Sequence, residues 1–344
     1  MVDVTVYGAG IFGLSVAWSC VKLGAKVQVI DPNGVAAGSS GGIVGALAPH
    51  TPENWNDKKE FQFQSLIMAE DYWADIAEVS GQSPGYARSG RLQPIADQRA
   101  HDLALKRQQG AAELWRGKAF WEIKLAADFE GWCPLSPSDF VIHDTLSARI
   151  HPRQACAALA AALRAKGVQI SPDGAPKGHI VWATGWRGLL DLSEETERPI
   201  GNGVKGQAIL LELDRADLPQ LFADALHVIP HADGTVAIGS TSERNFEDPN
   251  ATDWQLDEIY QRAINAVPAL RNAPILARWA GVRPRAKSRA PMLGNHPTRA
   301  DDFIANGGFK IGFGMAPKAG EVMADLILEN RDEVPEGFRP EASL

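Results

Sequence analysis

The sequence predicts an α/β protein with two interleaved units, one built on a central parallel sheet and the other on an antiparallel sheet. The chain opens with a strand, a glycine turn, a helix and a second strand, and this alternation returns in the middle and at the end. Between these parts lie an aromatic-rich stretch and a stretch of alternating apolar residues with a hairpin signal. At 344 residues, two domains are the natural expectation. We therefore assign residues 1–84, 146–208 and 280–344 to the first unit and residues 85–145 and 209–279 to the second.

The first strand, residues 4–7, leads into a turn whose three glycines match the demands of a bound pyrophosphate. Gly8 makes the tight turn, Gly10 lets the backbone approach a phosphate, and Gly13 lets the following helix pack against the sheet. The N-terminus of that helix offers free N–H groups and the positive end of its dipole to an anion. Asp31 ends the second strand, where its carboxylate can accept hydrogen bonds from ribose hydroxyls. This pattern predicts a dinucleotide-binding site.

The later elements of the first unit follow from apolar periodicity and from the positions of glycine and proline. The expected elements are a loop of small residues (32–52), helices (57–79 and 153–166) and strands (179–183 and 303–305). Pro317 is expected to begin the last helix, because proline is favoured in the first helical turn.

The second unit is marked by bulky side chains and by one strong turn signal. Large aromatic residues either line a pocket or fill a core, and the core is the commoner role. Six of them fall close together: Trp115, Phe120, Trp121, Phe129, Trp132 and Phe140. Asp233 and Gly234 stand between two apolar runs and predict a hairpin, and residues 253–266 predict a helix.

Composition excludes several classes of function. The 34 basic and 42 acidic residues give a net charge of −8, which disfavours a surface for nucleic acid. No run of eighteen apolar residues predicts a transmembrane helix, and the early Gly8 turn leaves no room for a signal peptide ahead of it. The three scattered cysteines indicate reduced thiols, and the eight histidines show no metal-ligand spacing. We therefore expect a cytoplasmic protein without a metal site.

Four separated motifs resemble the family of FAD-dependent amino-acid and amine oxidoreductases, which includes D-amino-acid oxidase, glycine oxidase, sarcosine oxidase and D-amino-acid dehydrogenases. In the order of the family they are Gly8 to Asp31, Gly38 to Ala48, Ile180 to Gly185, and Ala280 to Gly294 with the segment from Gly307 to Leu328. The resemblance implies an FAD-binding Rossmann-like three-layer domain with a discontinuous substrate domain, whose antiparallel sheet covers the isoalloxazine ring.

The same resemblance implies which residues contact FAD. Ser39 and Ser40 are expected to donate hydrogen bonds to the pyrophosphate, while the glycines of their loop let the backbone pass the ring. The helix expected after Pro317 would direct its N-terminus at the negative charge of reduced flavin. The expected cofactor residues are Gly8, Gly10, Ile11, Phe12, Gly13, Asp31, Pro32, Ser39, Ser40, Gly42, Gly45, Ala183, Thr184, Gly185, Gly312, Gly314, Met315 and Ala316.

The resemblance also implies the reaction, in which a small amino acid or amine is oxidised to an imine by hydride transfer to the flavin. Arg283, in the motif Gly281 to Pro284, takes the position that binds the substrate carboxylate. Its planar fork suits this role, because it makes two parallel charge-assisted hydrogen bonds to a carboxylate. The alternative for Arg283 is a structural ion pair or a surface position among neighbouring basic residues.

Two further expectations and two alternative functions accompany this hypothesis. No cysteine has the context of a covalent flavin link, so we expect FAD to be bound non-covalently. The electron acceptor is expected to be oxygen or a quinone-linked carrier. An NAD(P)-dependent dehydrogenase and a partner-dependent flavoprotein subunit are the alternative functions, and the motifs near the end of the chain argue against the first.

Overall fold

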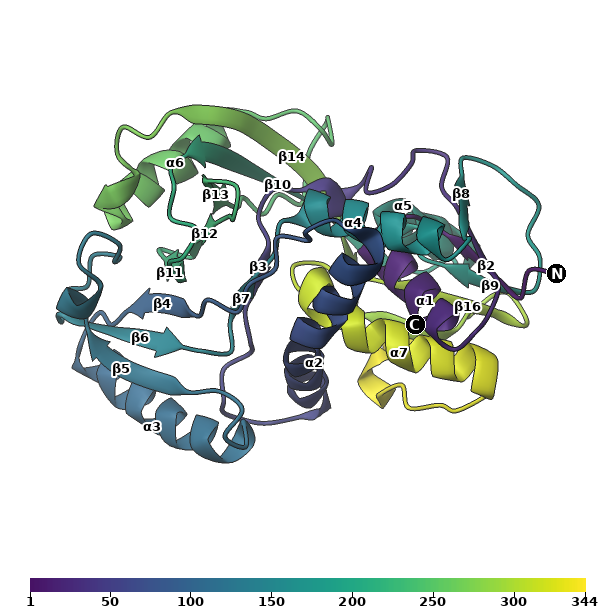
Figure 1. Cartoon of the computed structure of the whole chain (residues 1–344), viewed down its shortest axis with the longest axis horizontal. Coiled ribbons are helices and arrows are strands. Elements are labelled where there is room, and N and C mark those ends of the chain that lie inside the picture. The colour runs from purple at the N-terminus through teal and green to yellow at the C-terminus, as the bar shows by residue number, and fades with distance from the viewer.

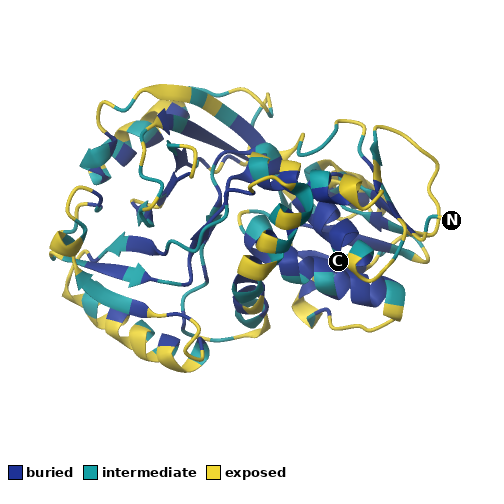
Figure 2. Cartoon of the chain, viewed as in Figure 1, coloured by how far each residue is buried: buried dark blue, intermediate teal, exposed yellow.

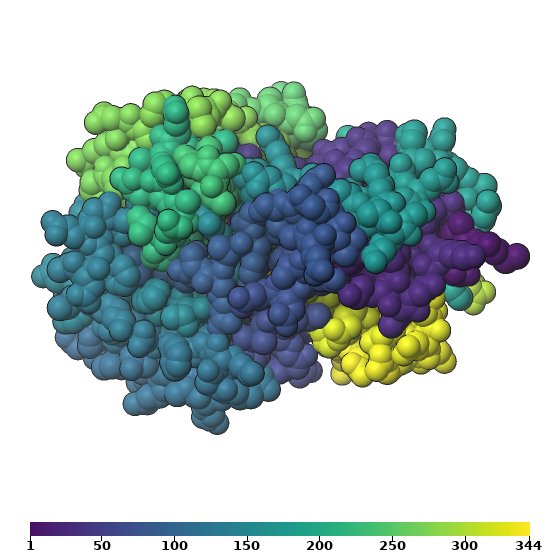
Figure 3. Space-filling model, in the orientation of Figure 1, coloured from purple at the N-terminus to yellow at the C-terminus, as the bar shows by residue number.

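The structure is a computed structural model that describes all 344 residues of the chain. Two lobes lie side by side in Figure 1, each built around its own β-sheet. In the space-filling view of Figure 3 the lobes are in contact, and the segment that contains helix α2 (Asp57–Ser80) lies between them. No helix is both long enough and apolar enough to cross a membrane.

The first lobe contains a six-stranded sheet in the order β15-β16-β9-β1-β2-β8. Its strands are β1 (Val4–Tyr7), β2 (Val27–Ile30), β8 (Gln169–Ser171), β9 (His179–Trp182), β15 (Met292–Asn295) and β16 (Asp302–Asn306). All neighbours pair in parallel except β15, which runs antiparallel to β16. Helices cover this sheet, so β1 is buried almost throughout, as parallel strands with covered faces are. Figure 2 shows this buried centre in dark blue.

Seven helices complete the chain, and most lie where apolar periodicity places them. They are α1 (Ile11–Lys22), α2 (Asp57–Ser80), α3 (Gln98–Leu114), α4 (Pro152–Ala165), α5 (Gly185–Glu195), α6 (Trp254–Ala266) and α7 (Gly312–Glu329). The expected helices over 57–79, 153–166 and 253–266 are confirmed as α2, α4 and α6 to within one residue at each end. The opening strand–helix–strand unit is confirmed as β1, α1 and β2.

The expected start of the last helix at Pro317 is wrong. Helix α7 begins at Gly312, and Met315 N–H already bonds to the carbonyl of Ile311 to close its first turn. Pro317 therefore lies inside the helix, where it removes one hydrogen bond to the carbonyl of Phe313. Tertiary packing outweighs this loss, because α7 is buried against α1 so closely that a Cβ on Gly320 would lie 2.6 Å from the Ser15 carbonyl oxygen.

The second lobe contains an eight-stranded sheet in the order β14-β10-β13-β12-β11-β4-β6-β5. Its strands are β4 (Arg91–Pro94), β5 (Trp121–Leu125), β6 (Phe140–Asp144), β10 (Gly201–Glu212), β11 (Gln220–Ala223), β12 (Leu226–Pro230), β13 (Thr235–Gly239) and β14 (Ile275–Ala286). The hairpin expected at Asp233 and Gly234 joins β12 to β13. Trp115, Trp121 and Trp132 are buried and do not line the large cavity, which confirms their core role.

A small two-stranded sheet and two long strands connect the lobes. Strands β3 (Ala46–Leu47) and β7 (Ala148–Arg149) pair with each other near the centre of the molecule. Strands β10 and β14 pair antiparallel from Gly201 opposite Ala286 to Leu211 opposite Ile275. We propose that the two lobes are separate domains and that β10 and β14 belong wholly to the second sheet. The boundaries expected at 208 and 280 then fall inside strands, since composition along the chain carries no information about a pairing partner.

A buried ion pair joins strands β4 and β6, close to the β5 edge of the second sheet. Arg91 on β4 lies opposite Asp144 on β6, and its Nε donates to Asp144 Oδ2 at 2.9 Å. The two residues are 6% and 0% exposed, so neither charge is stabilised by solvent. Asp144 also accepts the backbone N–H of Ser147 at 2.8 Å.

Replacing Asp144 by alanine is expected to leave the Arg91 charge buried without a partner. Loss of one partner from such a pair costs about 3–5 kcal/mol of unfolding free energy. Urea unfolding followed by circular dichroism measures this difference. The matched control is Asp257→Ala, because Asp257 pairs with Arg278 at 2.5 Å on the surface; it should stay within about 1 kcal/mol of the wild type. Equal effects of the two substitutions would contradict the assignment of a buried pair.

Candidate cofactor and substrate site

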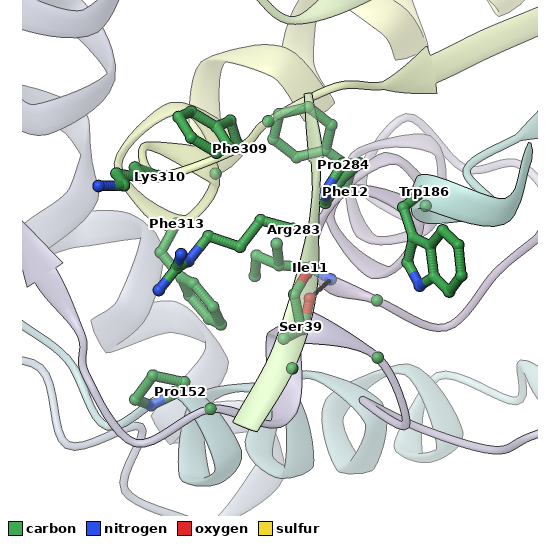
Figure 4. Close-up of a pocket in the computed structure, with 18 of the residues that line it drawn as sticks. Ile11, Phe12, Ser39, Pro152, Trp186, Arg283, Pro284, Phe309, Lys310 and Phe313 are labelled. Atoms are coloured by element: carbon green, nitrogen blue, oxygen red, sulfur yellow. Dashed lines mark hydrogen bonds between the residues drawn. The ribbon is translucent and has the colours of Figure 1, made fainter. Parts of the chain in front are cut away.

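A cavity of about 1270 Å³ lies where the two lobes meet, and both lobes contribute to its wall. One part of the wall is the glycine turn after β1 with the loop that follows β2. The other part is formed by β14 and by the loop before α7. Figure 4 shows Ile11, Ser39, Arg283, Lys310 and Phe313 gathered around this space.

The glycine turn forms a cradle that side chains would fill. A Cβ on Gly8, whose φ is +108°, would lie 2.3 Å from the Ala183 carbonyl oxygen. The backbone N–H groups of Gly10 and Phe12 have no acceptor in the protein and stand at the start of α1. Unpaired N–H groups at a helix N-terminus bind anions such as phosphate. The turn therefore fits the pyrophosphate of a dinucleotide.

Two neighbouring side chains hold this turn in shape. Ser40 Oγ accepts the N–H of Ile11 at 3.0 Å, which leaves the serine hydroxyl hydrogen free to donate to an anion. Asp31 Oδ2 accepts the N–H of Ala9 at 2.8 Å, and Oδ1 accepts the N–H of Asn33 at 2.9 Å. Each carboxylate oxygen keeps a further lone pair for a ribose hydroxyl. Sequence reasoning predicts the ribose contact of Asp31, and it missed the hydrogen bond by which Asp31 supports the turn.

Most of the residues predicted to bind the cofactor line this one cavity. They are Gly8, Gly10, Ile11, Phe12, Asp31, Pro32, Ser39, Ser40, Gly42, Gly45, Ala183, Thr184, Gly185 and Gly312. Gly13 does not line it, because it packs the helix onto the turn: its Cβ would lie 1.9 Å from the Gly8 carbonyl oxygen. Gly45 has a second packing role, since its Cβ would lie 1.8 Å from the Ile150 carbonyl oxygen.

Three predicted residues of the last helix lie away from the cavity. Gly314 packs against Leu66. Met315 and Ala316 lie within the first turns of α7, and their side chains are fully buried. The earlier start of α7 explains the difference, because the residues that reach the cavity are Ile311, Gly312 and Phe313. A helix N-terminus thus lies at the cavity, but it begins five residues earlier along the chain than predicted.

Arg283 projects from β14 into the cavity and lies flat over the neighbouring strand. A Cβ on Gly206 of β10 would lie 2.0 Å from Arg283 Nη2, so only glycine leaves room for the guanidinium. Arg283 Nη2 donates to Ser240 Oγ at 2.6 Å, and Nη1 donates to the Thr241 carbonyl at 3.3 Å. Burial lowers the pKa of Arg283 to about 10, with Glu243 acting in the opposite direction, so the side chain stays charged at neutral pH.

No carboxylate oxygen lies within 4.0 Å of the Arg283 guanidinium. The alternative interpretation as a structural ion pair is therefore not supported. The two acceptors that it has are uncharged and use two of its five N–H donors. Arg283 lines the cavity with donors to spare, which suits an anionic ligand.

Sequence reasoning missed several polar residues of the cavity wall, among them Arg91, His227, Lys310 and His50. Burial lowers the pKa of His227 to about 3, helped by the nearby charges of Arg91, Lys310 and Arg283, so His227 is neutral. Its Nδ1 is buried without a partner. Lys310 could have been identified from the sequence, because it is the one charged residue between Asn306 and Pro317. No sequence pattern indicates a site role for His227, since it lies in an otherwise apolar strand.

Comparison with known proteins places these features in one family. The sequence pattern of the family described as FAD dependent oxidoreductase matches residues 3–326. A glycine oxidase of Bacillus licheniformis is 24% identical, covering 98% of this chain and 97% of the relative. The bifunctional protein ThiO/ThiG of Trichormus variabilis is 25% identical over 96% of this chain. The chain spans about half the length of that relative.

Solved structures show the same fold. Iminodiacetate oxidase from Chelativorans sp. BNC1 superposes with a TM-score of 0.84 at 22% identity, over 98% of this chain and 99% of that one. Glycine oxidase from Geobacillus kaustophilus gives a TM-score of 0.83 at 19% identity, over 98% and 97% of the two chains. With the glycine cradle, the two helix N-termini and a family pattern that spans nearly the whole chain, this protein belongs to the FAD dependent oxidoreductases.

Proposed function

We propose that this protein binds FAD non-covalently and oxidises the C–N bond of a small amino acid to an imine, which water then hydrolyses. The observation that supports the substrate class is the Arg283 guanidinium, partly buried at the cavity wall and without a carboxylate partner. Relatives named glycine oxidase support the same class. A pyridine-nucleotide dehydrogenase is not favoured, because the family pattern extends through α7.

FAD, when bound, supplies the acceptor for a hydride from the substrate carbon. The task of the chain is to position both partners. The N–H groups at the start of α1 and the hydroxyl of Ser40 would hold the pyrophosphate. The N-terminus of α7 would face the isoalloxazine ring, where its dipole stabilises negative charge.

The substrate is held by its carboxylate. Arg283 donates two parallel hydrogen bonds to it, and Ser240 and Thr241 fix the guanidinium plane. Gly206 lets that plane lie close to the sheet. His227 is neutral and adds one hydrogen-bond donor or acceptor. Because it carries no positive charge, it does not compete with Arg283 for the substrate carboxylate.

The electron acceptor and the compartment are further parts of the proposal. Oxygen is the proposed acceptor because several relatives are named oxidases, and a quinone-linked carrier is the alternative. The three cysteines are free thiols, two of them buried, which supports a reducing compartment such as the cytoplasm.

The proposed activity predicts that the purified protein is yellow and that its flavin is bleached by substrate without oxygen. The panel contains glycine, N-methylglycine, proline and D-amino acids, with absorbance near the flavin band at about 450 nm as the readout. Acid precipitation should release the flavin into the supernatant, since no covalent link is expected. A colourless protein would contradict FAD binding. Flavin that no substrate bleaches would favour a partner-dependent subunit instead.

Replacing Arg283 by alanine is expected to abolish carboxylate binding while FAD stays bound. Loss of a buried charged hydrogen-bond partner costs about 2–5 kcal/mol, which lowers kcat/KM for a carboxylate substrate by about 30-fold or more. Arg283→Lys should recover only part of the activity, because lysine lacks the planar fork. The matched control is Arg278→Ala on the same strand, whose side chain pairs with Asp257 at the surface. Unchanged turnover of Arg283→Ala would remove it from the site.

Replacing Gly206 by alanine tests the position of the guanidinium without deleting it. The new methyl group would lie about 2.0 Å from Arg283 Nη2, so the guanidinium has to move. We expect KM for the substrate to rise by about tenfold with the flavin spectrum unchanged, since a shift of about 1 Å in a binding group costs this much or more. Gly337→Ala is the control, because nothing lies within 4 Å of its added Cβ. A normal KM for Gly206→Ala would contradict the placement of Arg283.

A further inference from the structure

The cavity wall formed by the second lobe and by the loop before α7 carries more positive charge than one carboxylate can neutralise. Three cations, Arg91, Arg283 and Lys310, are close enough to His227 to lower its pKa. Only Arg91 has a carboxylate partner, Asp144 at 2.9 Å. Arg283 and Lys310 form no ion pair within 4.0 Å. The wall therefore holds two positive charges without an ion-pair partner, although Glu243 acts on Arg283 from beyond 4.0 Å.

Lys310 is fixed close to Arg283 by the backbone. Its loop is joined to β14, the strand of Arg283, because Phe309 N–H donates to the Pro284 carbonyl at 2.9 Å and Gly308 forms a bridge with Arg285. Figure 4 shows the charged ends of Arg283 and Lys310 extending to the same side of β14. Burial, followed by the charges of Arg283 and Arg285, lowers the pKa of Lys310. Its Nζ has no hydrogen-bond acceptor in the protein.

Lys310 is exposed and Arg283 is partly buried, so water solvates both charges in part, but the two neighbouring cations still repel each other. A ligand that supplies negative charge relieves this repulsion. An amino acid with one carboxylate satisfies Arg283 and leaves Lys310 uncompensated. It also brings an ammonium group, which a second cation repels. A second anionic group on the substrate removes the imbalance, because each cation then receives its own oxygen acceptors.

We propose that Lys310 binds a second carboxylate of the substrate, so that the protein acts preferentially on amino dicarboxylates. This inference rests on the proposed function, in which Arg283 binds the carboxylate next to the reacting carbon. Lys310 is then the residue that sets specificity, and the reaction itself is unchanged. The C–H bond breaks with its electron pair passing to the bound flavin, the amine loses a proton to solvent, and the C=N bond forms.

A different role for Lys310 would give different results. Its charge could stabilise reduced flavin directly, as the N-terminus of α7 does. In that case its removal would affect every substrate alike and would also weaken the flavin adduct with sulfite. A specificity role affects only substrates with two carboxylates and leaves the sulfite affinity as it is.

The experiment uses two substrates, iminodiacetate and N-ethylglycine, which differ only in the distal group. Each is tested on three FAD-loaded proteins: the wild type, Lys310→Met and the control Lys26→Met. For the wild type, kcat/KM for iminodiacetate should exceed that for N-ethylglycine by about tenfold or more, as expected for one charged hydrogen bond. Lys310→Met should remove this preference and change kcat/KM for N-ethylglycine by less than about threefold. D-aspartate against D-alanine repeats the test for a carboxylate on the side chain.

Binding without turnover separates failure of the inference from failure of the proposed function. Malonate and acetate, titrated against the flavin spectrum, should bind the wild type with malonate tighter, and Lys310→Met should equalise them. Equal preference of the wild type for both substrates and both anions would overturn the inference while leaving the proposed function in place. An equal loss for both substrates in Lys310→Met, with weaker sulfite binding, would also overturn it. If no amine substrate reduces the flavin but malonate still binds through Lys310, the proposed function fails and the anion subsite remains.

Discussion

The antiparallel pairing of β10 with β14 is the interaction on which the site depends. These two strands of twelve residues run from the first lobe into the second and pair along nearly their whole length. The pairing brings Gly206 beside Arg283, so that a gap in one strand holds the guanidinium of the other. The outer edge of β14 then binds the loop before α7 through Pro284 and Phe309. This ladder and the loop bound to its edge therefore position Arg283 and Lys310 at the cavity.

Close backbone approach is the second constraint, and it explains why small residues dominate the cofactor side. Gly8 lies against the Ala183 carbonyl, and Gly13 lies against Gly8 itself. Side-chain oxygens then fix the geometry that the glycines permit: Ser40 accepts the N–H of Ile11, and Asp31 accepts the N–H of Ala9. Rigid support of this kind keeps the remaining N–H groups directed at a phosphate, because they have no competing acceptor.

The strand pairing and the close backbone approach together determine where positive charge lies along the cavity. The start of α1 and the start of α7 both reach its wall, so the positive ends of two helix dipoles meet there. Arg283 and Lys310 add full charges at the substrate side, while His227 between them stays neutral. Two buried carboxylates lie near this group, and each already has a basic partner: Asp144 pairs with Arg91, and Glu243 pairs with Lys205. The site as a whole is prepared for anions, which phosphates and carboxylates supply.

The sequence by itself determined the local features: the Gly8 turn with its helix and strands, the helices around residues 57–79 and 153–166, and the family to which Arg283 owes its expected role. These depend on apolar period and on glycine spacing, which neighbouring residues carry. The tertiary structure decided the rest. It moved the start of α7 to Gly312, because packing against α1 tolerates the proline at 317. It also brought His227, Arg283 and Lys310 together from three distant segments, since a contact made across paired strands leaves no trace in local sequence.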